Sequence, residues 1–462
     1  KGIIHLGMTS QDVVCNADLA ILERSQTLIR DKLACVAVAF AQQAGQWRST
    51  PCLAFTHYQP AQPTTVGRRF AQWSSELGLC ESRLGGTLTQ LWQRRRGIRG
   101  ATGTQASYLA LFGGDPISVD QLESWIVHEL TENFNSTDAL SAATSASVLS
   151  HDIAQKQFWG RVWAAEGNSG AVEANRAEIA RLQALNPEQV QHYFANNLRR
   201  AHTYPLGSQT YPRVIDTFIL ADLASVGAVL HKIATDIRLL CNRKELDEPF
   251  ENKQIGSSAM PYKRNPMRCE RICGLSRFVM NLVGNAYDTA ATQWLERTLD
   301  DSSNRRLSLP EAFLALDGAL DLMHNVASGL IVHEAMVKKN LMAELPFMAT
   351  ENIMMECVKL GGDRQHYHEL IRQHAQAAGL RVKQEGLDND LLDRLKNDKN
   401  FWSTKRGGPL SAELNWDGVM DPMKYVGRSV EQTERFIKEV VEPLREQYKD
   451  ALATLGTSGP KV

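Results

Sequence analysis

The proline-free stretch from residue 213 to residue 248 reads RVIDTFILADLASVGAVLHKIATDIRLLCNRKELDE. Within it, apolar residues recur at steps of three and four positions. Side chains at this spacing lie on one face of an α-helix. A helix of this length needs several neighbours to bury such a face, so the stretch predicts a helical bundle. The residues of the face are Leu223, Val226, Leu230, Ile233, Ile237 and Leu240.

Two more apolar series with the same spacing lie elsewhere in the chain. Intervals without proline cover residues 64–115, 267–309 and 311–345, and the alternating pattern of a β-strand is rare. We therefore expect an all-α fold built around a long central helical bundle. The two series are Trp73, Leu77, Cys80, Leu84, Leu88 and Leu91, and Leu316, Leu320, Met323, Val326 and Leu330.

The length of 462 residues predicts more than one domain, because a single core stops growing at about 250 to 300 residues. We assign residues 1–332 to the central bundle. Residues 132–203 are rich in Ala, Asn, Ser and Gln and are expected to form a less regular helical insertion in it. Beyond residue 333 the segments shorten and glycine pairs appear, which predicts a smaller C-terminal helical domain over residues 333–462.

The composition indicates a cytoplasmic protein. A formal net charge of -1 and a pI near 6.9 provide no global field for nucleic acid or an acidic membrane. We identify no apolar run long enough to span a bilayer and no secretory signal in the first residues. The eight cysteines include no Cys-x-x-Cys, which favours reduced thiols and predicts no metal site.

The segment from residue 254 to residue 266, QIGSSAMPYKRNP, is too polar for a core. Its glycine and prolines exclude a regular helix. Its hydroxyl, ammonium, guanidinium and amide groups suit an anionic ligand. These groups belong to Ser257, Ser258, Lys263, Arg264 and Asn265.

Two polar segments nearer the N-terminus have both a structural and a functional interpretation. Residues 5–12 place hydroxyls and a carboxylate just before a helix, where Thr9 or Ser10 could simply be an N-cap with Asp12 in the first turn. Residues 55–65 surround His57 with prolines and hydroxyls. A single histidine is usually structural, but this sequence excludes a helix interior and leaves the ring accessible to water.

Two further polar regions are weak signals when each is taken alone. Residues 103–107 and 207–212 are turns with amide and hydroxyl groups that could hold carboxylate or phosphate oxygens. Residues 296–306 contain three arginines with serines and an asparagine. Such a run is usually a solvated helix face, but it could also form a phosphate cradle.

Taken together, these segments resemble the fumarase and aspartase superfamily. Residues 256–266, GSSAMPYKRNP, are similar to its Gly-Ser-Ser-x-Met-Pro-x-Lys-x-Asn-Pro signature. The PYKRNP version, residues 297–306 and residues 344–352 resemble the adenylosuccinate branch more than fumarase or argininosuccinate lyase. The resemblance covers about residues 1–131 and 204–450. The family's N-terminal domain is expected to be absent from this chain, which starts only a few residues before the His-x-Gly-x-Thr-Ser segment.

The resemblance implies a reaction and roles for particular residues. The branch releases fumarate from adenylosuccinate to leave AMP, and from the succinylated carboxamide ribotide of purine synthesis. It implies Ser257 as general base, His57 as general acid and Lys263 as the cation that stabilises the alkoxide. The implied substrate-binding residues are His5, Thr9, Ser10, Thr56, Gln209, Ser258, Met260, Asn265, Arg271, Arg297, Ser302 and Arg306.

The resemblance also implies a homotetramer whose active sites each draw on three subunits, with no metal or organic cofactor. Two alternatives stay open at this point. One is a sister lyase that acts on argininosuccinate, malate or aspartate. The other is a non-catalytic helical scaffold that has kept the fold.

Overall fold

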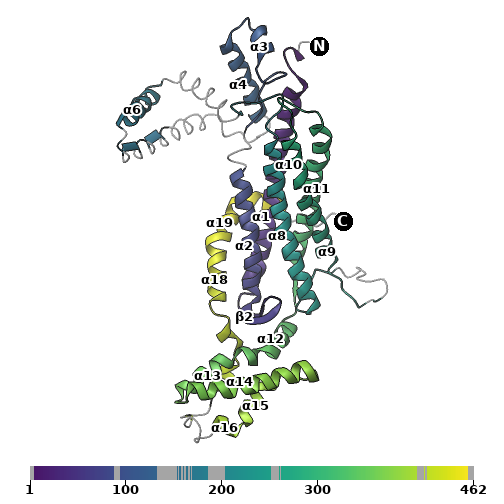
Figure 1. Ribbon diagram of the computed structural model, residues 1–462, viewed down its shortest axis with the longest axis vertical. Helices are drawn as coiled ribbons and strands as arrows, with labels where there is room; N and C mark the ends of the chain where they lie inside the picture. The colour runs from purple at the N-terminus through teal and green to yellow at the C-terminus, as the bar shows by residue number, and fades with distance from the viewer. Residues whose placement is uncertain are drawn as a thin grey trace. The chain divides into compact units, whose positions relative to one another are not determined.

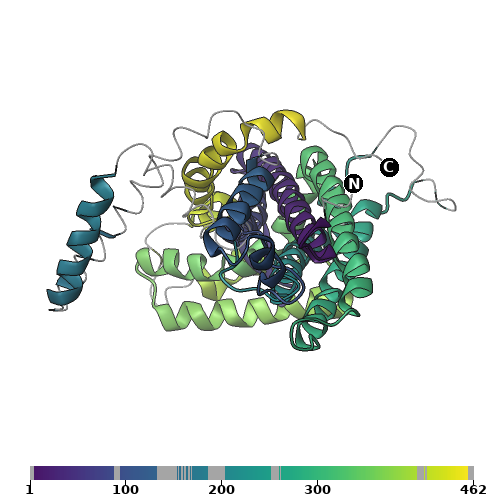
Figure 2. The same ribbon diagram turned by 90° about the horizontal axis from the view of Figure 1, so that it is seen from above.

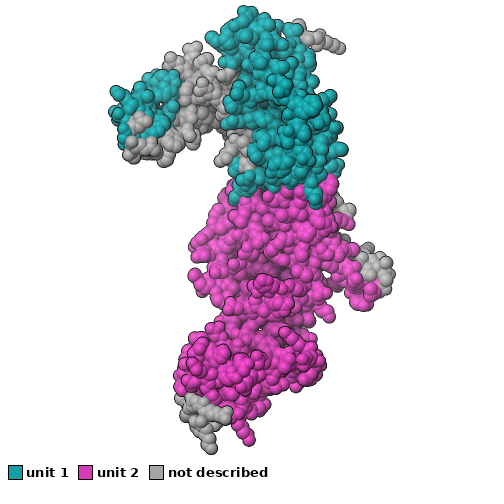
Figure 3. All heavy atoms as spheres, in the orientation of Figure 1, with its two compact units in different colours: residues 1–28, 82–222, 281–313 teal, residues 29–81, 223–280, 314–462 magenta. Residues whose placement is uncertain are grey.

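The computed structural model describes most of the chain and divides it into two compact units (Figure 3). Unit 1 contains Lys1–Leu28, Ser82–Asp222 and Asn281–Phe313, and unit 2 contains Ile29–Glu81, Leu223–Met280 and Leu314–Val462. The described residues are 5–87, 94–132, 153, 156–157, 160, 163–164, 167, 169–185, 203–250, 260, 262–402, 410 and 414–455.

The helix predicted from residues 213–248 is present as α8 (Val214–Asn242). All six residues of its predicted apolar face are buried. The series that begins at Leu316 is buried as well. It lies in α11 (Asp301–Gly329), except for Leu330 just after the helix, and α11 continues through Pro310. The series in α2 (Val66–Thr87) is buried at Trp73, Leu77 and Leu84, whereas Leu88 and Leu91 lie outside the described residues. The 3.6-residue period therefore identified the core faces of these helices.

Hydrogen bonds and ion pairs in unit 2 join its long helices to one another. The Trp73 indole of α2 donates to Asp236 of α8 at 2.9 Å, and Ser74 Oγ donates to the Ala37 carbonyl of α1 (Ser10–Gln46) at 2.7 Å. Lys32 of α1 pairs with Asp317 of α11 at 2.6 Å. Figures 1 and 2 both show α1, α2 and α8 side by side. The all-α expectation is confirmed by this helical packing.

Helix α8 corrects one expectation from the sequence. Among the described helices it is long and apolar enough to span a membrane, with a mean hydropathy of 1.6 over its most apolar window. The expectation that the chain holds no such run is therefore wrong. The physical reason is packing, because 56% of that window is buried inside the protein, as in the core helix of a bundle.

The described residues before position 333 also form helices of short to intermediate length and two small sheets. Strands β1 (Pro51–Thr56) and β2 (Gln59–Thr65) form an antiparallel hairpin, and β3 (Leu246–Asp247) pairs with β4 (Ile331–Val332). Most of the insertion expected at 132–203 lies outside the described residues. The helices are α3 (Ala106–Leu111), α4 (Pro116–Glu132), α6 (Ser169–Gln183), α9 (Met267–Asn281) and α10 (Val283–Ala291).

The C-terminal part of unit 2 contains shorter helices and a hydrophobic core of its own. That core is formed by buried residues between Ala349 and Val419, among them Tyr367, Leu395 and Phe401. The elements are α12 (Glu334–Met348), α13 (Thr350–Lys359), α14 (Arg364–Leu380), the π-helix η3 (Arg381–Glu385), α15 (Leu391–Asn397), α16 (Lys399–Trp402), α17 (Trp416–Val419), the 3-10 helix η4 (Pro422–Tyr425), α18 (Ser429–Phe436), the π-helix η5 (Ile437–Val441), α19 (Glu442–Gln447) and α20 (Lys449–Thr454).

We predict that Leu395→Ala destabilises this C-terminal core. Leu395 is fully buried in α15, and emptying such a site costs about 2–5 kcal/mol. Leu380→Ala is the matched control, because Leu380 is exposed and its loss should change stability by no more than about 0.5 kcal/mol. Hydrogen exchange of peptides from residues 346–436 measures both. Equal protection in the two variants would contradict a separate core.

Candidate active site

The carboxylate of Asp12 organises the start of α1 in unit 1. It is buried and accepts the backbone N–H groups of Thr9 and Arg99 at 2.8 Å and of Gly100 at 3.1 Å. The bond from Thr9 has the geometry of the return half of a capping box, with Thr9 immediately before α1 and Asp12 in its first turn. The bonds from residues 99 and 100 go further, because they fasten the loop that leads to residues 103–107 onto the same carboxylate.

The guanidinium of Arg96 extends this contact to a third segment. Arg96 is fully buried and donates to the Asp12 carboxylate. It also donates to the carbonyl oxygens of Gly100 at 2.8 Å and Ser208 at 3.0 Å. Tyr108 donates its hydroxyl to Asp12 at 3.3 Å, and burial, reinforced by the Asp12 charge, raises the pKa of this phenol. The hydroxyl therefore remains a donor at neutral pH.

The two weak turn segments of the sequence meet directly. Gly103 has φ +87°, and a Cβ atom there would lie 1.9 Å from the carbonyl oxygen of Gly207. Only glycine fits such an approach and such a backbone angle. The side-chain amide of Gln209 then donates to the Ala101 carbonyl at 2.9 Å. The structure thus unites segments that are about a hundred positions apart in the chain.

Residues of the 296–306 run lie at this same end of unit 1. Arg297 donates to the side-chain oxygen of Gln209 at 2.9 Å, so two predicted substrate-binding residues are in direct contact. Asp301, at the start of α11, accepts from Arg213 at 2.7 Å and lies 3.9 Å from Arg297. The Nε atom of Arg297 is buried without a hydrogen-bond partner among the described residues.

The remaining predicted residues of unit 1 lie closer to the surface. His5 precedes α1 and is exposed, and Ser10 is the exposed first residue of α1. Ser302 is partly buried in the first turn of α11, and Arg306 is exposed. The arginine next to it, Arg305, is the buried one. It donates to Asp216 at 2.6 Å and is a structural group rather than part of the exposed cradle.

Sequence reasoning missed Arg96 and Asp216, counted Arg305 only as one of three arginines in a possible phosphate cradle, and assigned Asp12 only a capping role. One signal was present, because Arg297, Asp301 and Arg305 recur every four residues, as on one helix face. Arg96 gave no such signal. It stands in the run QRRRG at residues 93–97, and its acidic partner is 84 positions away.

In unit 2, His57 lies in the tight turn of the β1–β2 hairpin. Thr56 pairs with Gln59, so His57 and Tyr58 form a two-residue turn, with φ angles of 53° and 56°. Two residues with positive φ define a type I′ turn, which normally takes Asn and Gly. His57 is exposed there. A bulky residue held in the left-handed region is strained, and such strain often marks a functional position.

The β1–β2 hairpin is stabilised by the groups that pack on Phe55. The rings of Phe55 and Tyr58 lie 5.6 Å apart, and the Arg243 guanidinium lies 4.7 Å from the Phe55 ring centre. Arg243 is held by Glu245 at 3.1 Å. Helix α12 also packs against both strands. These contacts keep the turn in place although its own backbone is unfavourable.

The described part of the signature segment is Met260 and residues 262–266. Lys263 is exposed, Asn265 is partly buried, and Arg264 lies 3.8 Å from Asp247. Ser257 and Ser258 lie outside the described residues. In the described part of unit 2, no hydrogen bond or ion pair joins His57 to Lys263.

Helix α9, which follows the signature, is anchored by a buried carboxylate. Glu248 accepts the backbone N–H groups of Arg268 at 3.1 Å and Cys269 at 2.7 Å, at the positive end of the helix. Arg271, predicted to bind substrate, is exposed one turn further along. Cys269 is buried, and burial raises the pKa of its thiol well above the usual value. Cys269 is thus a small core side chain.

The predicted site residues therefore fall into two groups. Unit 1 holds His5, Thr9, Ser10, Gln209, Arg297, Ser302 and Arg306, and unit 2 holds Thr56, His57, Met260, Lys263, Asn265 and Arg271. Within the described residues, no group of three or more His, Cys, Asp or Glu side chains could hold a metal ion.

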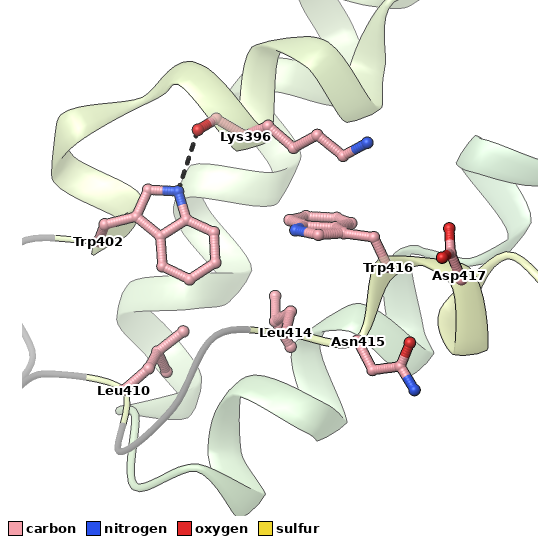
Figure 4. A pocket seen from close by; sticks show the side chains of 7 residues that line it. All are labelled: Lys396, Trp402, Leu410, Leu414, Asn415, Trp416 and Asp417. Atoms are coloured by element: carbon pink, nitrogen blue, oxygen red, sulfur yellow. Dashed lines mark hydrogen bonds between the residues drawn. The ribbon is translucent and has the colours of Figure 1, made fainter.

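A hollow in the C-terminal core is not a second candidate for the site (Figure 4). Trp402 and Trp416 line it at 71° to each other, and the Lys396 ammonium lies 5.5 Å from the Trp416 ring centre. The Trp402 indole donates to the Lys396 carbonyl at 3.1 Å. The indole N–H of Trp402 and the ring face of Trp416 are thus engaged in contacts within the domain.

Two family models match the chain. One, described as "Lyase", matches residues 1–155 and 170–281, and the other, "Adenylosuccinate lyase C-terminus", matches residues 346–436. The first match runs through most of the expected insertion and leaves residues 156–169 unmatched. Together with the helical bundle, these matches define a lyase of the fumarase and aspartase superfamily.

Curated relatives narrow the class to one family. The adenylosuccinate lyase of Schizosaccharomyces pombe is 41% identical over 98% of this chain and 78% of its own length. That of Saccharomyces cerevisiae is 38% identical over 98% of this chain and 77% of its own length. The chain belongs to the adenylosuccinate lyase family, and it is an enzyme.

Solved structures agree at the level of the fold. The 3-carboxy-cis,cis-muconate lactonizing enzyme from Pseudomonas putida matches with a TM-score of 0.63 at 22% identity, over 95% of this chain and 77% of that one. A fumarate lyase from Mesorhizobium sp. BNC1 matches with a TM-score of 0.60 at 19% identity, over 94% and 78%. They support the helical bundle predicted from the sequence.

We predict that Asp12→Asn raises the KM of the lyase reaction at least tenfold. Removing the charge leaves Arg96 buried without its counter-ion, which costs about 3–5 kcal/mol and releases three loops together. Steady-state kinetics and thermal unfolding measure the two effects.

Glu23→Gln is the matched control for this prediction. Glu23 pairs with the buried Arg95 at 2.8 Å in the same unit but bonds to none of the three loops. It should lower the unfolding temperature without changing the KM. Equal KM values in the two variants would contradict a role of Asp12 in holding the substrate-binding loops.

Proposed function

We propose that this chain catalyses the elimination of fumarate from adenylosuccinate, leaving AMP, and the same elimination from the succinylated aminoimidazole carboxamide ribotide. The observation that carries the proposal is the 41% identity with an adenylosuccinate lyase over 98% of the chain. Contact between Gln209 and Arg297, both predicted to bind substrate, supports it. A cytoplasmic location stays a prediction from composition.

Charge stabilisation is the main task of the proposed site. The proton that leaves lies next to a carboxylate and is very weakly acidic, so its removal creates a doubly charged aci-carboxylate. Fixed donors around that charge lower the barrier without reorganising during the reaction. We assign Ser257 as the base, Lys263 as the cation that favours its alkoxide, and Asn265 to the fumarate oxygens.

The leaving nitrogen must receive a proton as the carbon–nitrogen bond breaks, and we assign that step to His57. An imidazole can donate a proton near neutral pH. The exposed type I′ turn supports this role, because it holds the ring at the tip of a hairpin where a substrate can reach it. The paired strands limit the directions in which the turn can move.

We further propose a homotetramer that shares its active sites between subunits. Exposed leucine and isoleucine side chains form stripes on two long helices, which is typical of a surface that another copy covers. On α11, Leu307 and Leu314 are 67% and 66% exposed and lie two turns apart. On α1, Ile21 and Leu28 repeat the pattern. The division of the predicted site residues between two units is consistent with shared sites.

Substitution of the assigned acid and base tests the reaction. We expect Ser257→Ala and His57→Ala each to lower turnover by a factor of about 100 to 10,000, the range typical of general acid–base groups. His368→Ala on α14, an exposed histidine outside the site, should leave turnover unchanged. Fumarate release from adenylosuccinate is measured, with argininosuccinate, malate and aspartate as alternative substrates. Near-normal turnover in Ser257→Ala would refute the assignment.

Substitution within the leucine stripe tests the assembly. We expect Leu307→Asp to lower the sedimentation coefficient and abolish turnover, because a buried, unpaired carboxylate opposes association. Leu387→Asp, at an exposed leucine outside the long helices, is the control. Mixing the Ser257→Ala and His57→Ala chains should restore part of the activity if their groups come from different subunits. Wild-type sedimentation of Leu307→Asp would contradict the proposed interface.

A further inference from the structure

A groove of about 520 Å³ lies within unit 2 next to the His57 turn. It is bordered by the hairpin and by helices α2, α8 and α18. We call it the α2 groove and define it by the lining residues Tyr58, Thr64, Arg68, Arg69, Lys232 and Gln432. None of these residues has a part in the reaction proposed above.

The charges in the α2 groove are only partly balanced. The Lys232 ammonium is matched by Asp236 at 2.9 Å and lies 3.7 Å from Glu76. Arg68 donates instead to two neutral side-chain amides, Gln432 at 3.0 Å and Gln72 at 3.2 Å. Its charge therefore has no carboxylate partner among the described residues, and a guanidinium has five donors of which these bonds use two.

Arg69 is likewise held by neutral groups. It donates to the carbonyl oxygen of Leu53 at 2.5 Å. It also lies beside Cys52, and burial raises the pKa of that thiol, so the sulfur remains uncharged at neutral pH. Two adjacent, partly buried arginines thus lack a counter-charge in the described structure. Two neighbouring guanidinium groups without a carboxylate partner favour an oxyanion as ligand.

The other lining groups suit phosphate. Thr64 and Ser429 supply hydroxyls at 3.3 Å from each other, at the junction of β2 and α18. The volume exceeds that of a free phosphate. Tyr58 is 49% exposed and offers a ring face on which a planar group could stack.

Tyr58 connects the α2 groove to the reaction. It lines the groove and is the second residue of the strained turn, directly after His57. A ligand that touches its ring changes the balance of contacts on Phe55 and hence the stability of that turn. A ligand in the groove affects the His57 site if it binds more tightly to one state of the turn than to another.

We propose that the α2 groove is a second binding site, for a small phosphate-bearing anion, and that its occupancy acts on the turn that presents His57. The effect on turnover rests on the proposed function, whereas the binding of phosphate does not. Arg68 and Arg69 bind the phosphate oxygens, and Tyr58 transmits the occupancy to the turn.

Calorimetric titration with inorganic phosphate, in the wild type and in Arg68→Gln, tests the binding site directly. Phosphate bound at the proposed active site is common to both proteins, so the difference between the two titrations reports on the groove. We expect about one phosphate per chain, and a dissociation constant at least tenfold higher in Arg68→Gln, since hydrogen bonds to charged groups are lost. A separate titration with AMP alone checks the proposed function independently.

Two further variants complete the design. Gln432→Glu places a carboxylate against Arg68 without removing it, and should also abolish phosphate binding. Arg435→Gln makes the same change of charge at an exposed arginine of α18 that does not line the groove, and should bind like the wild type. The ligand could be free phosphate or the phosphate group of a nucleotide. Titration with cytidine monophosphate distinguishes the two, because tighter binding than that of phosphate identifies a nucleotide site.

Turnover provides the second readout. Saturating phosphate should change kcat in the wild type and in Arg435→Gln but leave it unchanged in Arg68→Gln and Gln432→Glu. Equal phosphate binding by the wild type and Arg68→Gln would overturn the site. Binding without any change in kcat would overturn its action on the turn.

Discussion

The buried ion pair between Asp12 and Arg96 is the contact on which the arrangement of unit 1 depends. A charge in the interior is costly unless it is paired and fully hydrogen-bonded. The two groups are paired, and most of their donors and acceptors are satisfied, only when the start of α1, the loop at residues 97–105 and the loop at residues 207–209 come together. The Nε atom of Arg96 stays buried without a hydrogen-bond partner among the described residues. The need to satisfy one carboxylate and one guanidinium therefore fixes three loops that carry predicted substrate contacts.

Unit 2 holds its catalytic candidate in a strained turn. Its catalytic candidate, His57, lies on a two-residue turn in which both residues occupy the left-handed region, at a cost of about 1–2 kcal/mol per residue. The strands on either side and the stack of Arg243, Phe55 and Tyr58 offset that cost. One unit thus places its residues by long-range charge pairing, and the other by a strained hairpin with close support.

Prediction from the sequence succeeded where the signal was periodic. The apolar faces of α8 and α11 followed directly from steps of three and four residues. The hairpin around His57 was not foreseen, because Pro60 and Pro63 lie in β2 and argue against a strand. They are tolerated because a two-stranded sheet consists only of edges. The type I′ turn was hidden as well, since His and Tyr occupy positions that usually hold Asn and Gly.

The sequence by itself determined the helical class of the fold, the family resemblance and the identity of most candidate residues. These depend on local spacing and on a contiguous motif, both of which a single chain displays. The tertiary structure alone decided which polar groups are buried, that Arg96 binds Asp12, that Arg305 is internal while Arg306 is exposed, and that Gly103 touches Gly207. The physical reason is that burial and charge pairing depend on segments about a hundred residues apart, and no local pattern records their approach.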